Sequence, residues 1–157
     1  MVFLATLTVG DAQSRPDFSG MWQLNVEKST LRARTPSQIL MKIEHAEPNL
    51  VQQILVTQRD GTESILVFTY ETTGQETRQP QAGETARSRA HWEGAELVIE
   101  SWMKTKDREF HFKDYWSLSS EHGTLTMSHR DDDLAGQTSV LDKAPPEAAQ
   151  KFKTGGK

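Results

Sequence analysis

The chain has 157 residues, a length that corresponds to one domain with one hydrophobic core. Hydrophobic residues make up 35% and charged residues 25%, and the mean hydropathy of -0.65 excludes a protein built from membrane-spanning helices. The net charge of -4 gives no electrostatic reason to expect a nucleic-acid partner. Cysteine is missing, which excludes thiolate nucleophiles, disulfides and cysteine-ligated zinc.

The two ends of the chain differ from its middle. Residues 2–10 read V-F-L-A-T-L-T-V-G, too short to span a bilayer but typical of the apolar part of a secretory signal, with a cleavage point before Gln13. The basic residues that normally precede such a part are missing, so an ordinary N-terminal strand is the alternative. We expect residues 1–15 to be a signal-peptide remnant or a disordered N-terminus, and the protein to be periplasmic or secreted. Residues 145–157 begin at a Pro-Pro pair that stops a strand, which predicts a tail with a short helix at most.

Residues 16–144 show the pattern of an all-β domain. β-Branched and aromatic residues occur in short runs between turn residues, and no helical period persists for three turns. The expected strands are residues 20–25, 38–45, 50–58, 63–72, 85–92, 97–103, 108–119, 124–130 and 137–143. Their tight links predict an antiparallel up-and-down meander of eight to nine strands.

Side-chain alternation fixes a register for four hairpins, because opposed apolar residues must lie on one face. The clearest turn is Asp60-Gly61, which as a two-residue loop pairs Val56 with Ile65. Two of the other hairpins pair Met41 with Ile54 and Trp92 with Leu97. The last one pairs Trp116 with Met127 and therefore also Asp114 with His129.

An open meander of this size would leave two long exposed edges, and closure into a barrel removes them. We therefore predict a barrel, with a two-sheet sandwich as the alternative. A barrel of eight or nine strands either fills with side chains or holds one small ligand, so its interior is a candidate binding site.

The segment Gly20-Met21-Trp22 opens the first expected strand with a Gly-x-Trp motif, which resembles the start of lipocalin-type barrels in the calycin superfamily. The resemblance implies that Trp22 closes one end of the barrel beneath a basic side chain from a late strand, here Arg130. A core aromatic is the alternative role for Trp22. The disulfides common in extracellular lipocalins are missing, and Met21 replaces a residue that is often small or polar.

Further motifs extend this resemblance over most of residues 17–143. The hairpin Trp92-Glu93-Gly94-x-x-Leu97 and the segment Tyr115-Trp116-Ser117-Leu118 resemble a group of small exported bacterial proteins of lipocalin-like shape. What this implies is a lipocalin-like fold and an exported compartment rather than an activity.

Asp114 and His129 are the most chemically informative pair, because the predicted register places both on the face that carries Trp116 and Met127. A carboxylate that orients an imidazole is part of many general-base devices. A satisfied polar pair inside a barrel is the alternative. Ser139, on the last strand, is the nearby candidate nucleophile, and the chain has no Gly-x-Ser-x-Gly elbow.

Three adjacent carboxylates, Asp131, Asp132 and Asp133, could supply oxygen ligands to calcium, although successive strand residues point in opposite directions. A solvated turn is the alternative. The five histidines lack the spacing of a helical zinc site. We therefore expect no cofactor, with calcium at the acidic run or a haem on His129 as the remaining alternatives.

Basic and small residues alternate along one expected strand, where Arg87 and Arg89 lie between Ala86, Ser88 and Ala90. The apolar pairing of the same hairpin favours small residues inside and arginines outside, since buried charges need partners. The reverse arrangement would suit an anionic ligand.

Three functions are compatible with these patterns. The leading hypothesis is that the cavity binds a small lipophilic molecule. The alternative is a small hydrolase of an ester or lactone, or an isomerase, that acts on a lipophilic substrate with Asp114, His129 and Ser139 and possible help from calcium. A filled barrel with a structural role is the third. The residues expected to line or close the cavity are Trp22, Phe68, Tyr70, Trp92, Phe112, Trp116 and Met127.

Overall fold

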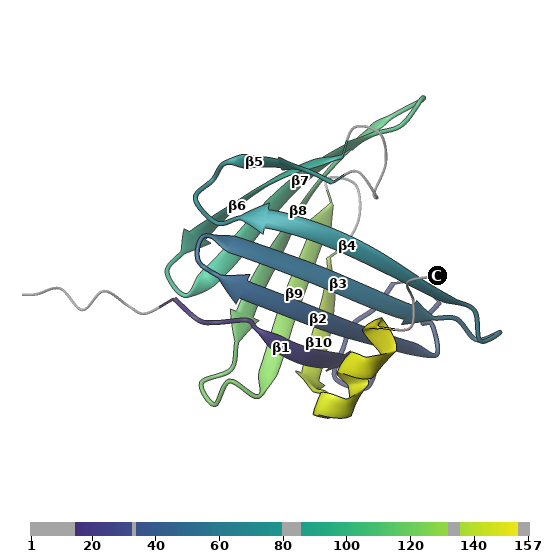
Figure 1. Cartoon of the computed structure of the whole chain (residues 1–157). Coiled ribbons are helices and arrows are strands. Elements are labelled where there is room, and N and C mark those ends of the chain that lie inside the picture. The colour runs from purple at the N-terminus through teal and green to yellow at the C-terminus, as the bar shows by residue number, and fades with distance from the viewer. Residues whose placement is uncertain (1–14, 33, 80–85, 132–135, 154–157) are drawn as a thin grey trace, which may run out of the picture.

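The chain folds into one ten-stranded antiparallel sheet that curls into a nearly closed barrel (Figure 1). The structure is a computed structural model and describes residues 15–32, 34–79, 86–131 and 136–153. The strands are β1 (Gly20–Leu24), β2 (Gln38–Ala46), β3 (Asn49–Thr57), β4 (Glu63–Glu71), β5 (Glu76–Arg78), β6 (Arg87–Glu93), β7 (Glu96–Lys104), β8 (Glu109–Leu118), β9 (Thr124–Asp131) and β10 (Gln137–Lys143). The apolar stretch expected to be a signal segment lies outside the described residues.

The strand order confirms the predicted meander. Successive strands are neighbours in the sheet except β4 and β5, which form the two ends of the order. The first strand also pairs with the last. The predicted number of strands is wrong, because the structure has ten rather than eight or nine. The additional strand is β5, whose Glu-Thr-Arg sequence carries no apolar alternation.

One side chain bridges the gap between β4 and β5. Gln79 directly follows β5 and is 3% exposed. Its Oε1 accepts a hydrogen bond from the backbone N–H of Thr69 at 3.1 Å, and its Nε2 donates to the carbonyl oxygen of Thr69 at 2.6 Å. At the seam between β4 and β5, the Gln79 side-chain amide thus satisfies the two backbone groups of Thr69 that a neighbouring strand would otherwise pair with.

Three of the four predicted registers are confirmed, and one is wrong. Met41 pairs with Ile54, Trp92 with Leu97, and both predicted pairs of the β8–β9 hairpin form.

In the β3–β4 hairpin, Ile65 pairs with Leu55 instead of Val56. The loop has three residues rather than two, because the N–H of Gly61 donates to the carbonyl of Gln58 and Gly61 has a φ of +86°. A glycine in this left-handed region is the mark of a turn followed by a bulge.

One end of the barrel is filled by a buried cluster of inward-facing side chains. Phe18 and Trp22 are both fully buried there, and the rings of Phe18 and Trp92 stack with centroids 5.8 Å apart. Other members of this core are Ile43, Leu50, Ala90, Leu97, Ile99, Trp116, Leu125 and Leu141. Among the described residues, this packing fills the interior at that end of the barrel.

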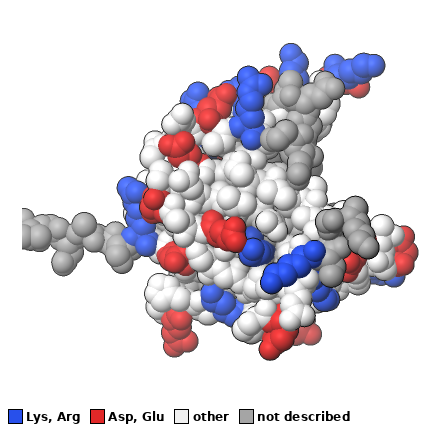
Figure 2. All heavy atoms as spheres, viewed as in Figure 1, with Lys and Arg blue, Asp and Glu red and all other residues white. Residues whose placement is uncertain are grey.

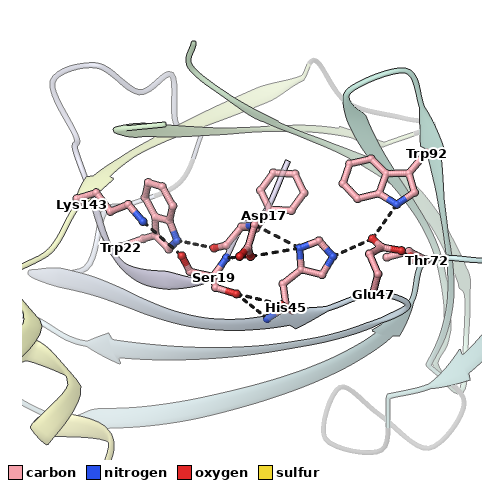
Figure 3. A network of polar contacts seen from close by, with 9 residues as sticks. Asp17, Ser19, Trp22, His45, Glu47, Thr72, Trp92 and Lys143 are labelled. Carbon is pink, nitrogen blue, oxygen red and sulfur yellow. Dashed lines mark hydrogen bonds and ion pairs between the residues drawn. The ribbon is translucent and has the colours of Figure 1, made fainter. Parts of the chain in front are cut away.

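A network of hydrogen bonds connects several strands at the filled end (Figure 3). The carboxylate of Glu47 accepts hydrogen bonds from Thr72 Oγ1 at 2.6 Å and Trp92 Nε1 at 3.0 Å, and it lies 2.8 Å from His45 Nε2. Burial raises the pKa of Glu47, but the hydrogen bonds from these three side chains outweigh it and hold the pKa below its ordinary value. The network therefore joins the β2–β3 turn to β6.

A basic side chain lies over Trp22, as the family resemblance implied, but it is Lys143 and not the predicted Arg130. The ammonium of Lys143, on β10, lies 4.1 Å from the centre of the Trp22 ring, while Arg130 lies over Tyr115. Lys143 pairs directly with Trp22 across β1 and β10, whereas Arg130 belongs to β9 and is exposed.

Gly20 makes room for this arrangement. Its φ is +139°, and a Cβ at this position would lie 2.7 Å from Lys143 Nζ. Only glycine combines this backbone conformation with the close approach of the lysine. The Gly-x-Trp motif therefore has a local physical cause.

The outer surface carries charges of both signs. On the face shown in Figure 2, acidic and basic side chains of the described residues lie among one another. A 3-10 helix, η2 (Pro146–Phe152), lies against this side of the barrel near β1 and β2, where Lys151 Nζ donates to Gln38 Oε1 at 3.1 Å. In the described ranges, no helix has the length and apolar character needed to cross a membrane.

Candidate functional site: the barrel cavity

The half of the barrel away from the filled end contains a cavity of about 460 Å³. Residues from eight of the ten strands line it, because inward-facing side chains alternate along every strand of a barrel. Its wall includes Met41, Ile54, Phe68, Tyr70, Ala86, Met103, Phe112, Trp116 and Met127. The third predicted function, the filled barrel, therefore does not describe this interior.

Of the seven predicted ligand-binding residues, five line the cavity. They are Phe68, Tyr70, Phe112, Trp116 and Met127. Phe68 and Tyr70 stack with ring centroids 6.4 Å apart, and Tyr70 meets Trp116 edge to face. Trp22 and Trp92 do not line the cavity, because the filled end of the barrel surrounds both of them.

A polar cluster crosses the wall formed by β8 and β9. His129 Nδ1 lies 2.8 Å from Asp114 Oδ1, and His129 Nε2 lies 3.1 Å from Asp131 Oδ1. The cluster continues to Arg32, whose guanidinium lies 3.6 Å from the second oxygen of Asp131. The structure thus brings together the predicted acid and imidazole and adds two charged residues to them.

Both carboxylates favour the charged form of His129. The hydrogen bond to Asp114 is the main cause that raises the pKa of His129, and the negative charges of Asp114 and Asp131 act in the same direction against the opposing effect of burial. An imidazolium donates from both ring nitrogens, which matches the two short contacts. Arg32, His129 and the two aspartates together carry no net charge in this state.

Ser139 also lines the cavity, but the structure does not hold it against the imidazole. It pairs with Met127 across β9 and β10, and its neighbour Gln137 pairs with His129. Among the described residues, no hydrogen bond joins Ser139 to His129, and carboxylates occupy both ring nitrogens. An imidazolium held in this way cannot accept the proton that a serine nucleophile must lose.

The described residues contain no group of three histidine or acidic side chains that could hold a metal ion. The carboxylate of Asp131 is directed at His129 and Arg32. Asp132 and Asp133 lie outside the described residues. The described part of the predicted calcium site is therefore engaged in ion pairs within the protein.

Uncharged polar groups complete the cavity wall. The hydroxyls of Ser88 and Ser101 lie 2.8 Å apart and are almost fully buried. Gln52, 4% exposed, donates from Nε2 to the sulfur of Met41 at 3.2 Å, and the Tyr70 hydroxyl lies 3.5 Å from Gln52 Oε1. Burial, with a smaller contribution from the charge of Asp114, raises the pKa of Tyr70, so its hydroxyl stays protonated.

The basic stripe on β6 behaves largely as the hairpin pairing predicts. Ser88 and Ala90 are buried, while Arg87 and Arg89 are paired with Glu76 at 2.9 and 3.5 Å. Arg87 nevertheless reaches the cavity rim, where its guanidinium lies 4.7 Å from the centre of the Trp102 ring.

Arg32 and Gln52 are cavity residues that sequence reasoning does not find. Gln52 carried a usable signal, because it is a polar residue at the inward position between Leu50 and Ile54. Arg32 carried none, since it precedes β2 in an irregular segment and is placed by tertiary structure alone.

Comparisons with protein-family models and with curated protein sequences found no match. Solved structures of the same fold do match. A point mutant of the fluorescent protein UnaG is 12% identical with a TM-score of 0.56, and the match covers 82% of this chain and 96% of that chain. The "REP1-NXSQ fatty acid transporter" is 11% identical with a TM-score of 0.54 and the same two coverages.

Lipid binding protein 8 from Caenorhabditis elegans is also similar, with 11% identity, a TM-score of 0.55, and coverage of 81% of this chain and 95% of that chain. At this level of identity, the likeness concerns the fold alone. The chain therefore shares the antiparallel β-barrel fold of these structures, as its Gly-x-Trp opening implied.

Proposed function

We propose that this protein binds a small lipophilic molecule inside its barrel. The observation that carries the proposal is the cavity of about 460 Å³, whose wall is mainly aromatic and aliphatic with a few converging polar groups. Sites for small molecules have this character, with volumes of about 300 to 1,000 Å³. Two of the similar structures support the proposal by their names, one a fatty acid transporter and one a lipid binding protein.

The lining is suited to an adaptable fit. Met41, Met103 and Met127 contribute flexible thioether side chains from three different strands. Methionine fills irregular gaps and tolerates ligands of differing shape. Phe112 and the aromatic pair on β4 add flat apolar surface on which rings or alkyl chains can pack.

The experiment is a titration with N-phenyl-1-naphthylamine, an uncharged dye that becomes fluorescent in apolar surroundings. The variant Ser139→Phe places a large ring in the cavity, and Ser117→Phe makes the same change at a position that alternates with the inward-facing Trp116 on β8. We expect the dye to bind the wild type and Ser117→Phe, and to bind Ser139→Phe at least about tenfold more weakly because the ring occupies its volume.

Thermal melts of all three proteins accompany the titration and establish that each is folded. Lack of dye binding to the folded wild type, or equal binding to both variants, would contradict a ligand site in the cavity. Saturable binding that only the cavity variant loses supports it.

A further inference from the structure

The polar groups of the cavity indicate which lipophilic molecules fit. We propose that the cavity selects uncharged lipophilic ligands whose polar end carries a hydroxyl or amide group, and that it discriminates against free carboxylates. This inference rests on the binding function proposed above and narrows it to a ligand class.

The arginines at the cavity are already paired. Arg32 lies 3.6 Å from Asp131, and Arg87 lies 2.9 Å from Glu76 while its guanidinium covers an aromatic ring. A guanidinium has five N–H donors, so a ligand carboxylate would have to share the arginine with the protein carboxylate that already faces it. Sharing brings a second negative charge close to the first, so the new ion pair gains less than one formed with an unpaired arginine.

The His129 imidazole at the cavity is also already paired within the protein. Each ring nitrogen of His129 faces an aspartate oxygen, at 2.8 Å for Asp114 and 3.1 Å for Asp131. The His129 ring therefore has no N–H left for an incoming anion.

The net charge of the polar cluster also disfavours a carboxylate ligand. Arg32 and protonated His129 offset the two aspartates, so the cluster is neutral before a ligand enters. An ionised carboxylate would add an uncompensated negative charge to an interior of low dielectric, next to two existing carboxylates. Such a charge is costly to bury.

The remaining polar groups suit an uncharged partner. They are hydroxyls and amides, which both donate and accept hydrogen bonds: Gln52, Tyr70, Ser88, Ser101, Gln137 and Ser139. The hydroxyl pair of Ser88 and Ser101 uses only one of its two protons between its members, which leaves the other available. An alcohol or a primary amide can pair with such groups without bringing a charge.

The experiment compares decanol, decanamide and decanoate, which share a ten-carbon scaffold and differ in the polar end. Each displaces N-phenyl-1-naphthylamine and is also titrated directly by calorimetry, at about pH 6, where decanoate is mostly ionised and His129 is mostly protonated. We expect decanoate to bind at least about tenfold more weakly than the other two.

Decanoate that binds as tightly as decanol would overturn this inference and leave the proposed function intact. Failure of the dye and of all three compounds to bind would overturn both.

A charge-removing variant tests the cause. At the same pH, Asp114→Asn removes one of the two carboxylates that face the cavity at this cluster, so decanoate affinity is expected to rise about fivefold while decanol changes by less than about twofold. The matched control is Asp107→Asn in the exposed β7–β8 turn, which is expected to change neither affinity.

If Asp114→Asn does not fold, Ser139→Lys introduces the cation instead, with Ser117→Lys as its control. No gain for decanoate in a folded cavity variant overturns the electrostatic explanation.

Discussion

Trp22 shows how much of the barrel depends on a single side chain. It is fully buried, its indole N–H donates to the carbonyl of Phe18 at 3.0 Å, and Lys143 lies over its ring. The sequence predicted the position through the Gly-x-Trp motif. It could not predict the partner, because Arg130 and Lys143 are both basic and only the pairing of the first strand with the last distinguishes them.

We expect Trp22→Ala to lower the free energy of unfolding by about 3–5 kcal/mol, since it removes a large buried aromatic side chain and leaves a cavity. Urea denaturation measures the change. Trp102→Ala, at a partly exposed site, is the control and is expected to cost clearly less. A loss below about 1 kcal/mol for Trp22→Ala would show that the ring is not a major part of the core.

His129 makes stability depend on pH. Its pKa is raised in the folded protein, mainly by the hydrogen bond to Asp114, so its ionised form stabilises the fold. The contribution is fully present below the unfolded pKa of about 6.5 and is lost as pH rises through the higher folded pKa. The difference in unfolding free energy between wild type and His129→Gln should therefore shrink as pH increases.

Urea titrations from about pH 6 to pH 9 measure this difference. His91→Gln, at the outer pair of His91 and Glu93, serves as the control for an exposed histidine. A wild-type advantage over His129→Gln that stays constant across the range would argue against an ionised imidazole in the cluster.

At the level of the strands, the sequence predicted nine of ten elements because each carries β-branched, aromatic or other apolar residues between turn residues. It missed β5, which is short and polar and exists because β6 pairs with it. The β3–β4 register was wrong for a related reason. Apolar residues occupy both faces of β4 from Ile65 to Tyr70, so alternation could not decide between a two-residue and a three-residue loop.

The seam between β4 and β5 can be tested through Gln79. Its amide holds both backbone groups of Thr69, so Gln79→Ala leaves them without these partners. We expect a loss of about 1–3 kcal/mol in unfolding free energy and faster hydrogen exchange at the Thr69 amide. Gln79→Glu, which can accept but not donate, should fall between wild type and alanine. Gln75→Ala, an exposed change nearby, is the control, and an unchanged exchange rate in Gln79→Ala would refute the bridge.

For the whole molecule, the barrel and the closeness of Asp114 and His129 were predictable, because strand alternation and loop length determine both. The cavity was not, since its volume depends on how side chains from opposite walls fill the space. Trp92 is an example. Its pairing was predicted correctly, but its ring bonds to Glu47 and stacks on Phe18 at the filled end, so it does not line the cavity. Contacts between distant segments decided this placement.

The pairing of β1 with β10 has a consequence for the way the chain folds. The Lys143 ammonium donates to the carbonyl of Ser19, which is 124 residues away in the sequence, and it also covers Trp22. Contacts over such a separation require a large loop to close before they contribute, which makes a topology of this kind slow to fold. During synthesis on the ribosome, β1 cannot complete its pairing until β10, more than a hundred residues later in the sequence, has emerged. The exposed edge of β1 is then the stretch for which a chaperone has the longest opportunity.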